Sequence, residues 1–367
     1  MAKTELRYEP DYAISPGATL RSTLVELGMK QADLAVRTGL SLKHINQIAQ
    51  GIAAITHESA LLLEKATGVP ARIWNAREAH YRDHLARTHD TKVLVADAAW
   101  LDELPVRDLV RRGYLTKGAD VGSRLQEVCR FFGVANRESW DGVWREPLAA
   151  FRKSPSFASQ TGAVATWLRL GEIEAAEIDC EPFDAKRFRT ILDHVRKLTG
   201  NADPGVFVPL LQKLCAEAGV AVVFVRELPG TRASGAARWL TPTKALIQLS
   251  LRHLSDDHLW FSFFHEAAHV LLHGKKELFI HEGSSGPQPL EALEREADAF
   301  ATNGLIPRRF DSELDSLKTD QTIIDFAVRI GIAPGVVVGR LQHEGLVGWN
   351  QHNHLKQRFR WIEPEAS

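Results

Sequence analysis

The segment that most restricts the fold of this chain runs from His265 to His269 and reads HEAAH, inside an apolar stretch that includes Trp260 and Phe264. On a helix, positions i and i+4 share one face, so both histidines can reach one ion. Two imidazoles and a carboxylate on so apolar a segment need partners, because burying them alone is costly. The segment therefore predicts a helix from about 255 to 273 that carries a metal site.

Glu266 follows the first histidine and is placed to take a proton from an attacking water. A catalytic zinc ion needs three protein ligands and an open position, so a third ligand must come from elsewhere. The helix expected at about 290–303 has apolar positions at Leu293, Ala297 and Phe300, which favour Glu296 only weakly as that ligand. The candidate carboxylates for the third ligand are Glu291, Glu294, Glu296 and Asp298. His273 drifts too far around the helix to be a ligand and is expected beside the site.

Composition indicates an ordinary globular protein in a reducing compartment. Lys and Arg together number 45 against 46 for Asp and Glu, so any nucleic-acid binding must depend on a local patch. The three cysteines form no CxxC pair, which argues against a disulfide framework and a thiolate zinc site. The N-terminus lacks a signal-peptide core, and the longest apolar run, around 220–225, is too short to cross a bilayer. We therefore expect a cytoplasmic protein with no membrane partner.

The pattern along the chain predicts an α+β fold that is mainly α. Three strand-like runs, at 221–225, 236–240 and 245–251, follow two amphipathic helices and precede the HEAAH helix. Four regions are expected: a helical DNA-binding domain at 1–85, a tryptophan-containing helical connector at 86–185, a metal-binding domain at 186–310 with a small sheet, and a helical extension of that domain at 311–367.

Residues 31–48 have the pattern of a helix-turn-helix. Gly39 forms the turn between two helices, and Ser41 can cap the second of them, expected at 42–49. That second helix would enter the major groove of double-stranded DNA, where amides can bind adenine and lysine can bind guanine or phosphate. Its outward residues are Ser41, Lys43, His44, Asn46 and Gln47, and Gln31, at a helix N-terminus, can hold a phosphate.

The alternative for this domain is a helical interaction module that does not bind DNA. Residues 1–85 contain ten Lys and Arg against nine Asp and Glu, so the domain is barely basic. We expect its affinity for an operator to depend on a local patch and on homodimerisation.

Two family resemblances accompany these patterns. The run ASGAARWLTPTKALIQLSLRHLSDDHLWFSFFHEAAHVLLHG, followed by EREADAFATNGLIP, resembles the ImmA/IrrE family of metallopeptidases over about 186–345. That family resembles minimal gluzincins, and its E-A-(N/D)-x-F-A segment, here EADAFA, implies Glu296 as the third zinc ligand. Asp298 stands where asparagine is common in the family. Residues of about 15–85 resemble XRE-type helix-turn-helix regulators, closest to the HigA antitoxins.

The resemblance to peptidases implies a group that stabilises an oxyanion. All four tyrosines precede residue 186, so a tyrosine of this region is excluded. The donors that stay open are Arg238, Arg252, His253, His258 and His281.

Two functions follow from these patterns. The first is a DNA-binding transcriptional regulator with a zinc endopeptidase that cleaves a regulatory protein, such as a repressor or a toxin partner, with Glu266 as base and then acid. The alternative is a HigA-like antitoxin and autorepressor whose zinc domain is structural or sensory. The intact Glu266 favours the first, because a structural site needs no base beside its ligand.

Overall fold

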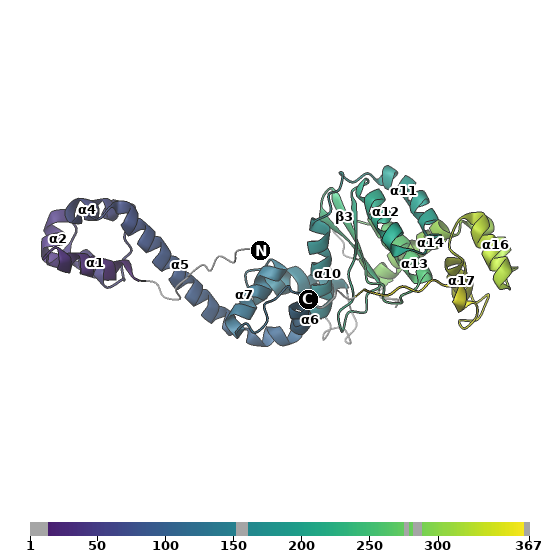
Figure 1. Cartoon of the computed structure of the whole chain (residues 1–367), viewed down its shortest axis with the longest axis horizontal. Coiled ribbons are helices and arrows are strands. Elements are labelled where there is room, and N and C mark those ends of the chain that lie inside the picture. The colour runs from purple at the N-terminus through teal and green to yellow at the C-terminus, as the bar shows by residue number, and fades with distance from the viewer. Residues whose placement is uncertain (1–13, 152–160, 275–278, 282–287, 363–367) are drawn as a thin grey trace, which may run out of the picture. The chain divides into compact units, whose positions relative to one another are not determined.

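The computed structural model describes residues 14–151, 161–274, 279–281 and 288–362 (Figure 1). The chain divides into two compact units, one of residues 1–97 with 120–126 and one of residues 98–119 with 127–367. Helices predominate and a single four-stranded sheet is described, which confirms the predicted α+β, mainly α class.

The first unit is a bundle of short helices. Gly39 ends the second helix in the left-handed conformation (φ 73°), and the Ser41 hydroxyl caps the third helix by accepting a hydrogen bond from the backbone N–H of His44 (3.1 Å). Gly17 leaves no room for a Cβ, which would lie 2.3 Å from the Ile48 carbonyl oxygen, so α1 and α3 pack closely. The helices are α1 (Pro16–Glu26), α2 (Gln31–Thr38), α3 (Leu42–Ala49), α4 (His57–Thr67) and α5 (Ala71–Val95).

The helix-turn-helix predicted from the sequence is therefore confirmed in its elements and in its turn. Its core contains Leu20, Leu34, Ile45 and Trp74, none of which is exposed to solvent. These apolar side chains fix the spacing of α2 and α3, the two helices of the motif.

The second unit begins with the tryptophan-containing helices. They are η1 (Ala98–Glu103), α6 (Val106–Arg111), α7 (Val121–Phe132), α8 (Arg137–Trp140), the π-helical turn η2 (Asp141–Arg145), α9 (Glu146–Phe151) and α10 (Thr161–Ala176). The first residues of α7 belong to the other unit. Trp100, Phe132, Trp140 and Trp144 form an aromatic cluster among these helices, with ring centroids 5.6–6.4 Å apart.

The rest of this unit surrounds the sheet. Its elements are α11 (Ala185–Leu198), α12 (Pro204–Ala216), β1 (Val220–Phe224), β2 (Gly235–Thr241), β3 (Lys244–Leu249), α13 (Asp256–Leu272), β4 (Phe279–His281), α14 (Gln288–Leu305), η4 (Arg308–Phe310), α15 (Asp311–Leu314), α16 (Asp320–Ile330), α17 (Pro334–His343) and η5 (Asn353–Leu355). The strand order is β1-β3-β2-β4, with β1 parallel to β3 and the other two pairs antiparallel. The three predicted strands are confirmed, and β4 is an addition.

Alternation along β3 separates the two faces of the sheet. Ile247 and Leu249 belong to the core that also contains α13. Gln248 points the other way and donates a hydrogen bond to the Trp167 carbonyl of α10 (2.7 Å), while the Trp167 indole donates to the Val225 carbonyl (2.9 Å). Helix α10 thus covers the face opposite α13 (Figure 1), although the sequence placed it in the connector.

The C-terminal segment is connected to the start of α13 by a backbone hydrogen bond and an ion pair. The backbone N–H of Asp256 donates to the Gln357 carbonyl (3.0 Å), and Lys356 Nζ pairs with Asp257 Oδ2 at 2.6 Å. The Lys356 ammonium also donates to Gln342 Oε1 of α17 (2.7 Å). Both side chains of the ion pair are under one-tenth exposed, so each charge depends on the other.

Among the described residues, no single helix is both long enough and apolar enough to cross a membrane. Only α16 and α17 together, bent by 114°, reach that length and composition.

Replacing Lys356 by Met should destabilise the second unit by about 3–5 kcal/mol, because the Asp257 carboxylate would stay buried without its cation. Urea unfolding followed by tryptophan fluorescence measures the change. The double variant Lys356→Met with Asp257→Asn should recover a large part of the loss, since no charge is then buried. Equal loss in the single and the double variant would show that the pair is not coupled.

Candidate metal centre

Helix α13 carries the HEAAH residues into the interior of the second unit. Ser255 stands at its N-cap position, and its apolar side chains, including Phe263 and Phe264, are buried against the sheet and the C-terminal helices. His265 and Glu266 are completely buried and His269 is 2% exposed. The predicted helix is therefore confirmed, and it buries its polar residues as well as its apolar ones.

The two imidazoles meet a carboxylate from α14. His265 Nε2 lies 3.0 Å from His269 Nε2 and 3.1 Å from Glu294 Oε2, and His269 Nε2 lies 3.5 Å from Glu294 Oε1. These three side chains are the described group of His, Cys, Asp and Glu residues that could hold a metal ion, with their candidate ligand atoms within 4.8 Å of one another. Two imidazoles and one carboxylate are a donor set that zinc accepts at a catalytic site.

At the third position of this set the structure places Glu294 rather than the predicted Glu296. Helix α14 buries Ala297 and Ala301. Glu294 precedes Ala301 by seven residues, two turns, and therefore lies on the same inward face. The Glu296 side chain is 58% exposed, since it lies about 100° around the helix from Ala297. The sequence signal for Glu294 is the spacing of Ala297 and Ala301, two small residues that are buried on one face of α14. The larger apolar residues Leu293 and Phe300 are only half-buried, so they are a poorer guide to the inward face.

A second layer of residues orients the imidazoles. Asp298, one turn after Glu294, accepts a hydrogen bond from His265 Nδ1 at 2.9 Å, so in the neutral imidazole the lone pair of His265 is on Nε2. His273 lies beside the site, as expected, with its Nδ1 2.8 Å from His269 Nδ1. Glu296 belongs to this layer, because its Oε2 lies 3.3 Å from His273 Nε2.

The electrostatics of the cluster favour a cation. Burial lowers the pKa of His265, but its hydrogen bonds with Asp298 and Glu294 outweigh burial and raise that pKa to about 10. With the Nδ1 proton directed at Asp298, the Nε2 lone pair of His265 faces an oxygen of Glu294. Two acceptors at 3.1 Å need a proton or a metal ion between them, so the residues fit zinc.

The Glu266 carboxylate lies against strand β2 of the sheet. Burial raises its pKa to about 8, with His265 acting to lower it and Glu294 to raise it. Neither of its oxygens has a hydrogen-bond partner among the described residues. A Cβ at Gly235 of β2 would lie 2.6 Å from Glu266 Oε1, so only glycine at that position leaves space for the carboxylate.

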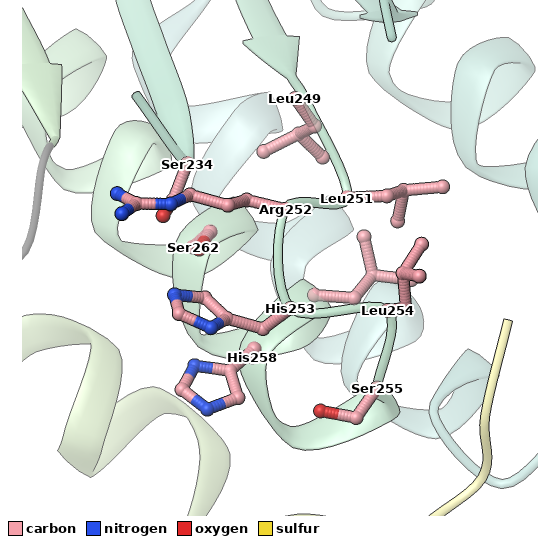
Figure 2. Close-up of a pocket in the computed structure, with 10 residues that line it drawn as sticks. Ser234, Leu249, Leu251, Arg252, His253, Leu254, Ser255, His258 and Ser262 are labelled. Carbon is pink, nitrogen blue, oxygen red and sulfur yellow. The ribbon is translucent and has the colours of Figure 1, made fainter. Parts of the chain in front are cut away.

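The candidate donors for stabilising an oxyanion lie in different parts of the second unit. Arg238 is occupied by Glu172, with Nη1 and Oε1 2.8 Å apart, and lies over the Trp144 ring. Arg252, His253 and His258 gather around a hollow at the start of α13, as Figure 2 shows. The side chain of His281 lies outside the described residues.

The predicted DNA-contacting residues lie along the outer side of the helix-turn-helix. Lys43 and Asn46 are exposed and Gln47 is half-buried, on the side of α3 opposite the buried Ile45 and Ile48. Asn46 Oδ1 accepts a hydrogen bond from Gln50 Nε2 (3.1 Å). The remaining three are Gln31 and His44, both half-buried, and the exposed Ser41.

Glu294→Gln should weaken zinc binding far more than Glu296→Gln. Among the described residues, the first change removes the carboxylate that lies beside both imidazoles, and the second changes a side chain that pairs with His273. We expect a loss of more than about 100-fold for Glu294→Gln and of at most about 10- to 100-fold for Glu296→Gln, the usual effect of an outer partner. Competition with a chromogenic chelator measures both affinities.

Glu291→Gln is the matched control, because Glu291 also lies on α14 and pairs with Arg295 (3.4 Å). A greater loss in Glu296→Gln than in Glu294→Gln would restore Glu296 as the ligand.

Comparison with known proteins gives two matches to family models. Residues 20–74 match a helix-turn-helix model, and residues 218–342 match the IrrE N-terminal-like domain of a peptidase family. No significant match was found among curated proteins or among solved structures. The first match contains α2 and α3, and the second contains the four strands, α13 and α14. The chain thus joins a helix-turn-helix domain of the XRE type to a metallopeptidase-like domain of the IrrE/ImmA type.

Proposed function

We propose that the chain is a transcriptional regulator whose second unit is a zinc-dependent endopeptidase that cleaves a regulatory protein. The observation that carries the proposal is Glu266, a completely buried carboxylate without a hydrogen-bond partner among the described residues, next to a His-His-Glu cluster. Burying such a group is costly and gives no structural benefit unless it acts on something that enters the site.

His265, His269 and Glu294 would hold the zinc ion, which would supply Lewis acidity toward a peptide carbonyl and an attacking water. Glu266 would accept the proton of that water and later pass it to the leaving amine. A base works best when its pKa is near the working pH, and burial moves that of Glu266 in this direction. Asp298 and the His273–Glu296 pair would keep the two imidazoles in the tautomers that binding requires.

The first unit would bind an operator in double-stranded DNA through α3. Lys43, Asn46 and Gln47 share one exposed side, three and four residues apart, as in a helix that enters the major groove. A homodimer on two half-sites would supply the affinity that a weakly basic domain lacks.

The alternative, a HigA-like antitoxin with a structural metal centre, uses the same DNA-binding unit. It gives no role to Glu266. A structural zinc site usually has four protein ligands, whereas the described cluster offers three and has a carboxylate beside them that can accept a proton. Cleavage of a regulatory protein, whether a repressor or a toxin partner, would distinguish the two functions, because the alternative includes no cleavage.

Glu266→Gln should abolish proteolysis and leave the zinc affinity nearly unchanged. The amide keeps the shape of the carboxylate but accepts no proton, and general-base catalysis contributes about 10²–10⁴-fold. Zinc-loaded full-length protein is incubated with a peptide library derived from a proteome, and new termini are counted by mass spectrometry. Equal cleavage by wild type and variant, or none by wild type, would overturn the peptidase proposal.

Lys43→Ala combined with Gln47→Ala should weaken binding to the operator by about 2–6 kcal/mol, from about 1–3 kcal/mol for each base contact. The operator is obtained by selection from random duplexes, and affinity is measured by fluorescence anisotropy at fixed salt. Lys65→Ala, which removes an exposed charge from α4, is the matched control. Undiminished affinity in the double variant would show that α3 does not read DNA.

A further inference from the structure

A small hollow that is partly open to solvent lies at the start of α13 (Figure 2). Its fixed walls come from the end of β3 at Leu249, the start of β2 at Ser234, and α13 at Ser262. The loop between β3 and α13 closes the remaining side with Arg252 and His253. The hollow is therefore built mainly from the same elements that position the metal centre.

The polar groups around the hollow are donors or cations. Figure 2 shows the Arg252 guanidinium and the imidazoles of His253 and His258 turned to the same side, and the two imidazoles stack with centroids 4.1 Å apart. The hydroxyls of Ser234 and Ser262 add two further donors. The described residues that line the hollow include no aspartate or glutamate.

Among the described residues, one carboxylate beside the hollow is already paired. Asp257 is the carboxylate that acts electrostatically with His258, but it pairs with Lys356 Nζ at 2.6 Å and accepts a hydrogen bond from the Ser255 hydroxyl at 2.6 Å. Arg252 Nη1 donates to the Arg232 carbonyl, which holds the guanidinium in place and leaves it several other N–H groups. Arg252 therefore brings a positive charge to the hollow.

The loop that presents Arg252 and His253 has an unusual backbone. Leu251 and Leu254, on either side of them, have φ angles of 57° and 53°, in the left-handed region that side chains other than glycine rarely adopt. Such conformations cost about 1–3 kcal/mol each and cluster at binding sites, where they direct side chains. Here the two turns direct Arg252 and His253 toward the hollow.

The hollow lies next to the proposed base. Ser262 is one helical turn before Glu266 on α13, and Ser234 precedes Gly235, whose missing side chain leaves the space that the Glu266 carboxylate fills. A polypeptide held with its scissile bond at Glu266 would therefore place a neighbouring group at this hollow.

We propose that the hollow binds a carboxylate of the substrate polypeptide, either an acidic side chain or a free C-terminus, and so selects where the chain is cut. The proposal rests on the peptidase function proposed above. Arg252 would bind the carboxylate through paired N–H donors, and His253, His258 and the two serine hydroxyls would donate to its remaining lone pairs.

The test measures binding, so it does not need turnover. Short peptides that end in a hydroxamate, a group that binds zinc directly, carry Glu, Gln or Lys at each position beside it, and their affinities for zinc-loaded full-length protein are measured by calorimetry. We expect Glu to bind about 10- to 100-fold more tightly than Gln at one position, as for hydrogen bonds to a charged group. Arg252→Met should remove this preference without changing the affinity for acetohydroxamate, which has no side chain.

Arg232→Met is the matched control, because that side chain is exposed and its backbone carbonyl is retained. In a second set of peptides the carboxylate is placed at a free C-terminus and then amidated, which separates the terminal group from an acidic side chain. Equal affinity of Glu, Gln and Lys at all positions, or a preference that survives Arg252→Met, would overturn the proposal. Failure of acetohydroxamate to bind would overturn the metal centre and this subsite with it, whereas absence of cleavage with an intact Glu preference would overturn only the peptidase activity.

Discussion

The burial of His265, Glu266 and His269 on one apolar helix is the constraint on which the second unit depends. Three groups that prefer water are held among aromatic and aliphatic side chains, and burying such groups without partners is costly. Helix α14 supplies partners for the two imidazoles through Glu294 and Asp298, one turn apart. The sheet supplies a glycine where a side chain would displace the Glu266 carboxylate. The surrounding elements therefore all serve one polar cluster.

This arrangement also explains why the unit is larger than its metal centre. Helix α10 covers the sheet face opposite α13 through contacts of Trp167 and Gln248. The C-terminal segment covers the start of α13 through the buried pair of Lys356 and Asp257. Both elements lie outside the residues that match the IrrE-like model, and each fixes a surface that the site needs. A rigid α13 is required, because a small displacement of the imidazoles would separate them from Glu294.

The candidate functional residues lie on the exposed side of a helix in the first unit and on a buried helix in the second. In α3 the chemistry is on the exposed side, and the buried Ile45 and Ile48 serve only to hold the helix. In α13 the chemistry is buried with the apolar residues, so it can act only on what enters the site. An exposed helix of the helix-turn-helix and a buried HEAAH helix in one chain fit the proposed regulator, which would bind DNA and act on a second protein.

Much of the fold and of the metal centre could be predicted from local sequence patterns. Gly39 and Ser41 determine the turn and the cap of the helix-turn-helix, and the HEAAH spacing determines that two imidazoles face one point, because each depends only on backbone geometry within a few residues. The strands were predictable within a residue or two for the same reason, apart from the short β4. Local sequence patterns could not show which carboxylate faces the histidines. It depended on the rotation of α14, which the burial of Ala297 and Ala301 against the rest of the unit decided in favour of Glu294. The space left by Gly235 and the hollow beside Glu266 likewise arise from residues far apart in sequence, so only the packing of strand, loop and helix could bring them together.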